Sequence, residues 1–113
     1  MPSYITVAPA EGTWVVRAGG AVLAESSRAL ELREEGHEPV IYFPREDVAM
    51  AFLEASTKHT ICPHKGDAGY YAIVTEAGTL PDAVWTYVQP KEDVHQISEM
   101  LAFDPRHATV EQI

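Results

Sequence analysis

The feature that most limits the fold of this chain is the spacing of its turn signals. Short segments rich in β-branched and aromatic residues recur about every ten residues, separated by glycine, proline or polar residues. The clearest predicted strands are 13–17, 21–25, 40–43, 70–75 and 83–88. About six to eight such strands, with one or two short helical turns, predict a mainly β sandwich or barrel.

Turn residues join these segments into hairpins. Ala18-Gly19-Gly20 separates the first two strands, and Glu76-Ala77-Gly78-Thr79 separates the last two. A third turn is predicted at Lys65-Gly66-Asp67. Segment 28–35 remains open between strand and helix, because its leucines alternate while its residue types favour helix. Segments 46–53 and 92–100 are the predicted helical turns.

The length of 113 residues fits one domain. Residues 1–12 carry Pro2 and Pro9 and are predicted to form an extended N-terminal arm. Residues 13–113 are predicted to form a single β domain.

The charge of the chain excludes several partners. Lys and Arg number 8 against 17 Asp and Glu, which gives a net charge of −9. A charge of this sign repels phosphate groups, so we expect neither nucleic-acid nor anionic-membrane binding. No apolar run approaches the roughly 18 residues of a membrane span.

Cys62 is the one cysteine, so the chain can form no internal disulfide. The start of the sequence shows no basic region before an apolar run, and a free thiol suits a reducing compartment. We therefore expect a cytoplasmic protein. An activated Cys62 nucleophile and a buried, inert thiol are both consistent with this position, and the inert thiol is favoured.

Three stretches place aromatic residues beside cations: 42–47, 62–71 and 85–87. Arg45 and Lys65 would supply positive charge, and the aromatic side chains would supply walls, for a small polar or anionic ligand. The candidate ligand-binding residues are Tyr42, Arg45, Cys62, Lys65, Asp67, Tyr71 and Trp85. Because side chains alternate along a strand, Tyr70 and Tyr71 should face opposite ways, while Trp85 and Tyr87 should share a face.

Neither a metal nor a cofactor is expected. His59, Cys62 and His64 have the side chains of metal ligands, but a second pair of ligands is missing. Aromatic residues in a small β domain are also commonly core, so at least half of them need no functional explanation.

The same stretches carry a resemblance to a known family. Tyr-Phe-Pro-Arg-Glu-Asp-Val at 42–48, Cys-Pro-His-Lys-Gly-Asp-Ala-Gly-Tyr-Tyr at 62–71 and Trp-Thr-Tyr at 85–87 resemble the domain of unknown function number four-hundred-and-twenty-seven. His64 departs from the motif, where the family is expected to have tyrosine. The resemblance implies a tent-like pair of antiparallel sheets meeting at a large angle. Type-B methionine sulfoxide reductases and the thalidomide-binding domain of cereblon share this broad architecture.

A nucleotidyltransferase label is attached to this family, and the chain does not fit it. Such enzymes resemble one another in a glycine-rich turn followed by two metal-binding acids spaced one residue apart. Gly19-Gly20 and Glu31 are present, but Arg33 occupies the position of the second acid. The label is therefore not adopted.

Two functions remain open on the sequence. The first is the binding of a small polar or anionic ligand. The alternative is a protein-interaction or homo-oligomerising β module without catalysis, with an exposed aromatic such as Tyr87 on its partner surface.

Overall fold

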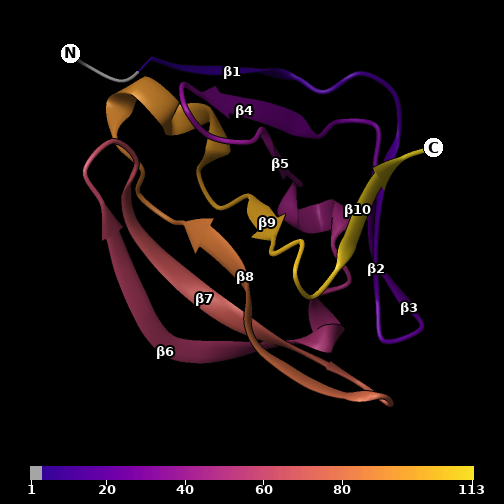
Figure 1. The fold of residues 1–113 in the computed structure, drawn as a ribbon. Coiled ribbons are helices and arrows are strands. Elements are labelled where there is room, and N and C mark those ends of the chain that lie inside the picture. The colour runs from indigo at the N-terminus through magenta and orange to yellow at the C-terminus, as the bar shows by residue number, and fades with distance from the viewer. Residues whose placement is uncertain (1–3) are drawn as a thin grey trace.

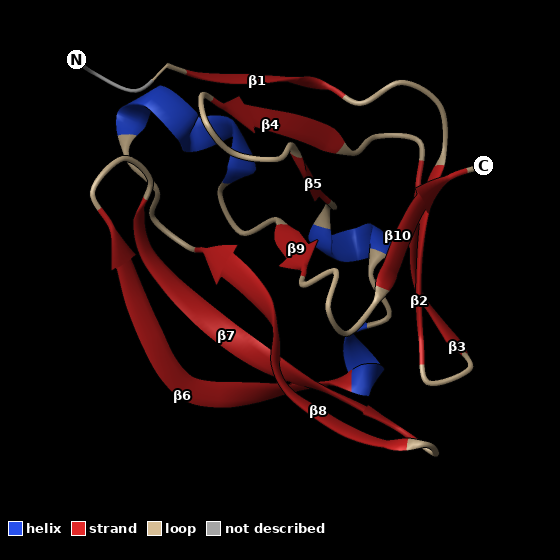
Figure 2. Cartoon of the chain, viewed as in Figure 1, coloured by secondary structure: helices blue, strands red, loops and turns tan. Residues whose placement is uncertain are grey.

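The computed structural model describes residues 4–113, which form ten strands and three short 3-10 helices (Figures 1 and 2). The strands are β1 (Ile5–Pro9), β2 (Trp14–Ala18), β3 (Ala21–Ser26), β4 (Leu30–Glu34), β5 (Val40–Tyr42), β6 (Leu53–Cys62), β7 (Gly66–Thr75), β8 (Gly78–Tyr87), β9 (Leu101–Phe103) and β10 (Thr109–Gln112). The helices are η1 (Arg45–Asp47), η2 (Met50–Phe52) and η3 (Glu92–Ile97). The predicted mainly β class is confirmed.

The strands form three antiparallel sheets, which we name after their central strands. The β4 sheet has the order β1-β4-β5, the β2 sheet has the order β10-β2-β3, and the β7 sheet has the order β6-β7-β8-β9. The β4 and β7 sheets are the two halves of the expected tent, and they open away from each other in Figure 1. The small β2 sheet is an addition to the expected pair.

The two halves of the tent meet at the end of β5. Phe43 and Leu101 exchange backbone hydrogen bonds of 2.8 and 2.9 Å, which places β5 beside β9. The strands therefore form one bent surface in the order β1-β4-β5-β9-β8-β7-β6. Because side chains alternate along each strand, this surface has two faces, and the two faces pack differently.

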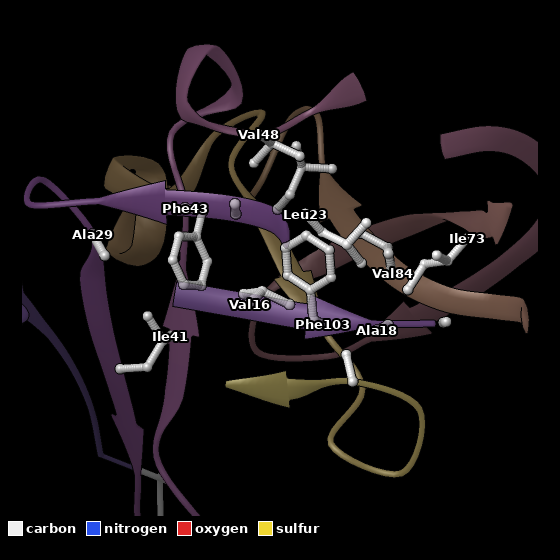
Figure 3. Packing of buried hydrophobic residues seen from close by; sticks show 14 of the residues in the cluster. Val16, Ala18, Leu23, Ala29, Ile41, Phe43, Val48, Ile73, Val84 and Phe103 are labelled. Atoms are coloured by element: carbon white, nitrogen blue, oxygen red, sulfur yellow. The ribbon is translucent and has the colours of Figure 1, made fainter. Parts of the chain in front are cut away.

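One face of the bent surface packs against the β2 sheet and makes the main core (Figure 3). Phe43 is fully buried at its centre, with its ring edge-on to Phe103 at a centroid distance of 5.9 Å. Val16 and Leu23 cover them from the β2 sheet. The opposite face carries a second, smaller cluster, and Val94 and Ile97 of η3 pack into it.

Pairing with neighbouring strands determines the secondary structure of the segments that the local sequence pattern did not settle. Leu30–Glu34 is strand β4, because β1 and β5 pair with it on both sides and outweigh its helix-favouring composition. Residues 5–9 of the predicted arm are β1, the partner of β4 on one side. Residues 1–3 of that arm lie outside the described residues.

The third predicted turn lies slightly earlier than expected. The turn residues are Pro63 to Lys65, and β7 already begins at Gly66. Gly66 has a φ of +115°, a backbone conformation that favours glycine, so the chain can enter the new strand directly. Asp67 is therefore a strand residue, paired with Ile61 across the hairpin.

No helix formed by residues 4–113 has both the length and the apolar character needed to cross a membrane.

Removing the Phe43 ring should destabilise the whole fold. Phe43→Ala is expected to lower the free energy of unfolding by about 3–5 kcal/mol, because it leaves a cavity at the centre of the main core. Urea denaturation followed by circular dichroism measures this change. Val22→Ala is the control, since Val22 is 50% exposed and should change stability by less than about 0.5 kcal/mol. Similar values for the two variants would contradict this account of the core.

Candidate functional site: an aromatic cavity between two sheets

The second face of the bent surface lines a cavity of about 690 Å³ that is open to solvent on one side. Its walls come from β4 and β5 on one side and from β6, β7 and β8 on the other. The lining residues are Leu32, Glu34, His37, Glu38, Val40, Tyr42, Lys58, Cys62, Pro63, His64, Lys65, Tyr70, Asp82, Trp85, Tyr87, Asp104 and Arg106.

A tyrosine and a tryptophan from opposite sheets join the inner walls. Trp85 Nε1 donates a hydrogen bond of 3.1 Å to the hydroxyl oxygen of Tyr42. Tyr42 is 1% exposed, and this burial raises the pKa of its phenol to about 12. Tyr87 lines the same cavity, and burial raises the pKa of its phenol as well. Both groups therefore remain protonated at physiological pH.

Tyr70 completes the aromatic lining from β7. Its hydroxyl and that of Thr60 share a hydrogen bond of 2.8 Å. The Lys58 ammonium lies 4.7 Å from the centroid of the Tyr70 ring, a cation–π distance. Lys58 is thus held against the wall of the cavity.

An ion pair closes part of the open side of the tent. Lys65 Nζ lies 2.7 Å from Glu34 Oε1, and the two side chains are only 13% and 9% exposed. Lys65 comes from the β6–β7 turn, whereas Glu34 ends β4, so the pair links the two sheets. The hydrogen bond from Lys65 holds the pKa of Glu34 below its ordinary value, against the opposing effect of desolvation.

The other buried or half-buried carboxylates of the lining also have partners. Arg106 binds both oxygens of Asp104 through Nε and Nη2, the closest contact being 2.7 Å. This hydrogen bonding lowers the pKa of Asp104. Ser56 donates a hydrogen bond of 2.6 Å to Asp82. The cavity thus combines an aromatic interior with five charged groups that are paired or hydrogen-bonded: Glu34, Lys65, Asp82, Asp104 and Arg106.

Four of the sequence-predicted site residues come together here: Tyr42, Cys62, Lys65 and Trp85. Cys62 is a free, half-buried thiol in the lining. The Lys65 ammonium is directed to Glu34 rather than left free for a ligand. His64 is exposed in the β6–β7 turn and belongs to the cavity lining.

The remaining three predicted residues lie outside the cavity lining. Tyr71 faces the main core, opposite to Tyr70, as the alternation along β7 requires. Arg45 lies beside Tyr71, with its Nη2 3.2 Å from the Tyr71 hydroxyl. Asp67 is an exposed residue of β7. Neighbours in the sequence motif are therefore separated by the sheet.

Several of the lining residues were not among the ligand-binding residues predicted from the sequence. Strand alternation could have identified Tyr70 and Tyr87. It places Tyr70 and Tyr71 on opposite faces of one strand, and it places Tyr87 on the same face as Trp85. Glu34 and Asp104 had no such signal, because their place in the site depends on how distant strands pair.

Within residues 4–113, no group of three or more His, Cys, Asp or Glu side chains could hold a metal ion. Glu31 and Arg33 occupy the two positions where a nucleotidyltransferase would have metal-binding acids. Here the two side chains form an ion pair of 2.7 Å with each other.

These observations define a small, mainly β domain in which two diverging antiparallel sheets surround an aromatic cavity. A family model described as Domain of unknown function (DUF427) matches residues 6–113, and the chain belongs to this family. A comparison with curated proteins gives no match.

The Glu34–Lys65 ion pair should make stability depend on acid pH. The pKa of Glu34 is lowered from 4.5, so the pair stabilises the fold above that pH and loses this effect as pH falls through the lower, folded-state pKa. Glu34→Gln should therefore cost roughly 1–3 kcal/mol at pH 7, because it leaves Lys65 without its partner, and much less near pH 3. Urea denaturation at both pH values measures the difference. Glu35→Gln, at the exposed neighbouring residue, is the control, and an equal loss in both variants would contradict the assignment.

The buried phenol of Tyr42 should ionise late. Its pKa is raised to about 12, so a difference titration at 295 nm between the wild type and Tyr42→Phe should show a step near that pH rather than near 10. The fold favours the neutral phenol, so its contribution to stability is complete below pH 10 and declines as pH rises through 12. Circular dichroism over the same range checks that the protein is still folded. A step at pH 10 in folded protein would show that Tyr42 is accessible to water.

Proposed function

We propose that this chain binds a small polar ligand in the cavity between the β4 and β7 sheets. The observation that carries the proposal is the aromatic lining of Tyr42, Tyr70, Trp85 and Tyr87 around a space of about 690 Å³. Pockets of roughly 300–1,000 Å³ with apolar walls and a few polar groups are typical of small-molecule sites.

The arrangement of charge favours a polar ligand over a strongly anionic one. Of the two cations expected to hold an anion, Arg45 lies outside the cavity and Lys65 is paired with Glu34. Arg106 is likewise engaged by Asp104. A net charge of −9 adds a general repulsion of anions.

The position of Tyr87 does not support the alternative of an interaction module. Tyr87 is 6% exposed and lines the cavity, so it cannot be the exposed aromatic of a partner surface. The large apolar side chains that are exposed come from separate elements: Tyr4, Val22, Ile61, Val74, Val88 and Ile113. Homo-oligomerisation is therefore kept as an outcome of the test below.

Native mass spectrometry of the protein as purified tests the proposal. A bound small molecule should appear as extra mass that is lost on denaturation. Val40→Phe places a larger side chain on the cavity wall and should abolish this mass, whereas Val22→Phe, at an exposed position of β3, should retain it.

If the purified protein carries no extra mass, a metabolite extract is added and the same comparison is made. Retention of ligand by Val40→Phe, or no extra mass under either condition, would contradict binding in this cavity. A ligand-free dimer or larger species would favour the interaction module.

A further inference from the structure

The hydroxyl groups of two largely buried tyrosines face the cavity, and neither has an acceptor for its proton among residues 4–113. Tyr87 is 6% exposed, and its hydroxyl makes no hydrogen bond to any other residue of 4–113. Tyr42 is 1% exposed, and within the same residues its hydroxyl only accepts a hydrogen bond, from Trp85. Among residues 4–113 only Thr86 Oγ1 is both fully buried and unpaired, so the unpaired Tyr87 hydroxyl is open to the cavity. These two protons are therefore free to be donated to a molecule in the cavity.

The phenols act as donors over the physiological pH range. Burial raises the pKa of Tyr42 to about 12 and raises that of Tyr87 too. A protonated phenol can donate to a carbonyl oxygen or a ring nitrogen of a ligand. It offers little to a group that has only donors.

Two of the three cations of the lining are already paired, whereas the carboxylates of Glu38 and Asp82 have no basic partner within residues 4–113 and stand beside phenol donors that a cation with only donors cannot use. Lys65 with Glu34 and Arg106 with Asp104 are already paired, so an anion would have to displace an existing partner. Lys58 has no carboxylate partner within residues 4–113, but its ammonium is stacked over Tyr70. An uncharged ligand needs no such displacement, and flat aromatic walls suit a flat molecule.

We propose that the cavity is selective for an uncharged, planar ligand bearing a hydrogen-bond acceptor, and that the hydroxyl groups of Tyr87 and Tyr42 are the donors that recognise it. This inference rests on the proposed ligand-binding function and names the chemical class of the ligand. Tyr87 and Tyr42 are thus the specificity-determining residues of the site.

Three planar probes of nearly equal shape separate the ligand classes. Benzamide is neutral with an acceptor, benzoate is anionic with acceptors, and benzamidine is a cation with donors only. Each is titrated into uniformly ¹⁵N-labelled protein while the two tryptophan indole N–H signals are observed by NMR. Trp14→Phe assigns the remaining signal to Trp85, whose N–H points to Tyr42. Benzamide should shift the Trp85 signal at a lower concentration than either ion.

Single-hydroxyl variants test which groups recognise the probe. Tyr87→Phe should weaken benzamide binding by about three- to tenfold, the effect of losing one neutral hydrogen bond. The same variant should leave the melting temperature of the empty protein nearly unchanged, because the Tyr87 hydroxyl bonds to no other residue of 4–113 and is open to the cavity. Tyr42→Phe should also weaken benzamide binding. Tyr71→Phe, on the opposite face of β7, is the matched control and should not change the affinity.

The outcomes separate this inference from the proposed function. Tighter binding of benzoate or benzamidine than of benzamide would overturn the ligand class while supporting a ligand site. Unchanged benzamide affinity in both Tyr87→Phe and Tyr42→Phe would overturn the assignment of donors. If none of the probes shifts the Trp85 signal, the inference fails, and the mass-spectrometric comparison decides the proposed function independently.

Discussion

The backbone hydrogen bonds between Phe43 and Leu101 are the constraint on which the rest of the structure depends. They join the β4 sheet and the β7 sheet into one bent surface. Because side chains alternate along each strand, successive residues then point to opposite faces of this surface. Phe43 enters the main core, while its neighbour Tyr42 enters the cavity. The stability of the core and the shape of the cavity are therefore set by the same pair of strands.

Away from this junction, side chains hold the two sheets together. The Trp85–Tyr42 hydrogen bond ties the inner walls, and the Lys65–Glu34 ion pair ties the sheets nearer the open side. These contacts pair several of the polar groups that line the space between the sheets. Tyr42 and Tyr87 lie in its walls, and desolvation is the main cause of their raised pKa values.

Local pattern was sufficient to predict what depends on neighbouring residues. The hairpins around Gly19-Gly20 and Gly78, the opposed Tyr70 and Tyr71, and the shared face of Trp85 and Tyr87 all follow from turn chemistry and strand alternation. Local pattern could not show which face became the cavity, because the β2 sheet covers one face and leaves the other open. Nor could it place Glu34 opposite Lys65, 31 residues away, since that contact exists only once the sheets have paired.

The motif that marks the family is therefore not the same as the site. Within Tyr42-Phe43-Pro44-Arg45, one aromatic lines the cavity, the next is the centre of the core, and the arginine stacks near Tyr71 on the other face. A run of adjacent residues in β strands cannot all reach one ligand, because alternate side chains leave in opposite directions. Such a run therefore serves the fold as much as the candidate site. The site is identified instead by every second residue, Tyr42 on one wall and Trp85 and Tyr87 on the other.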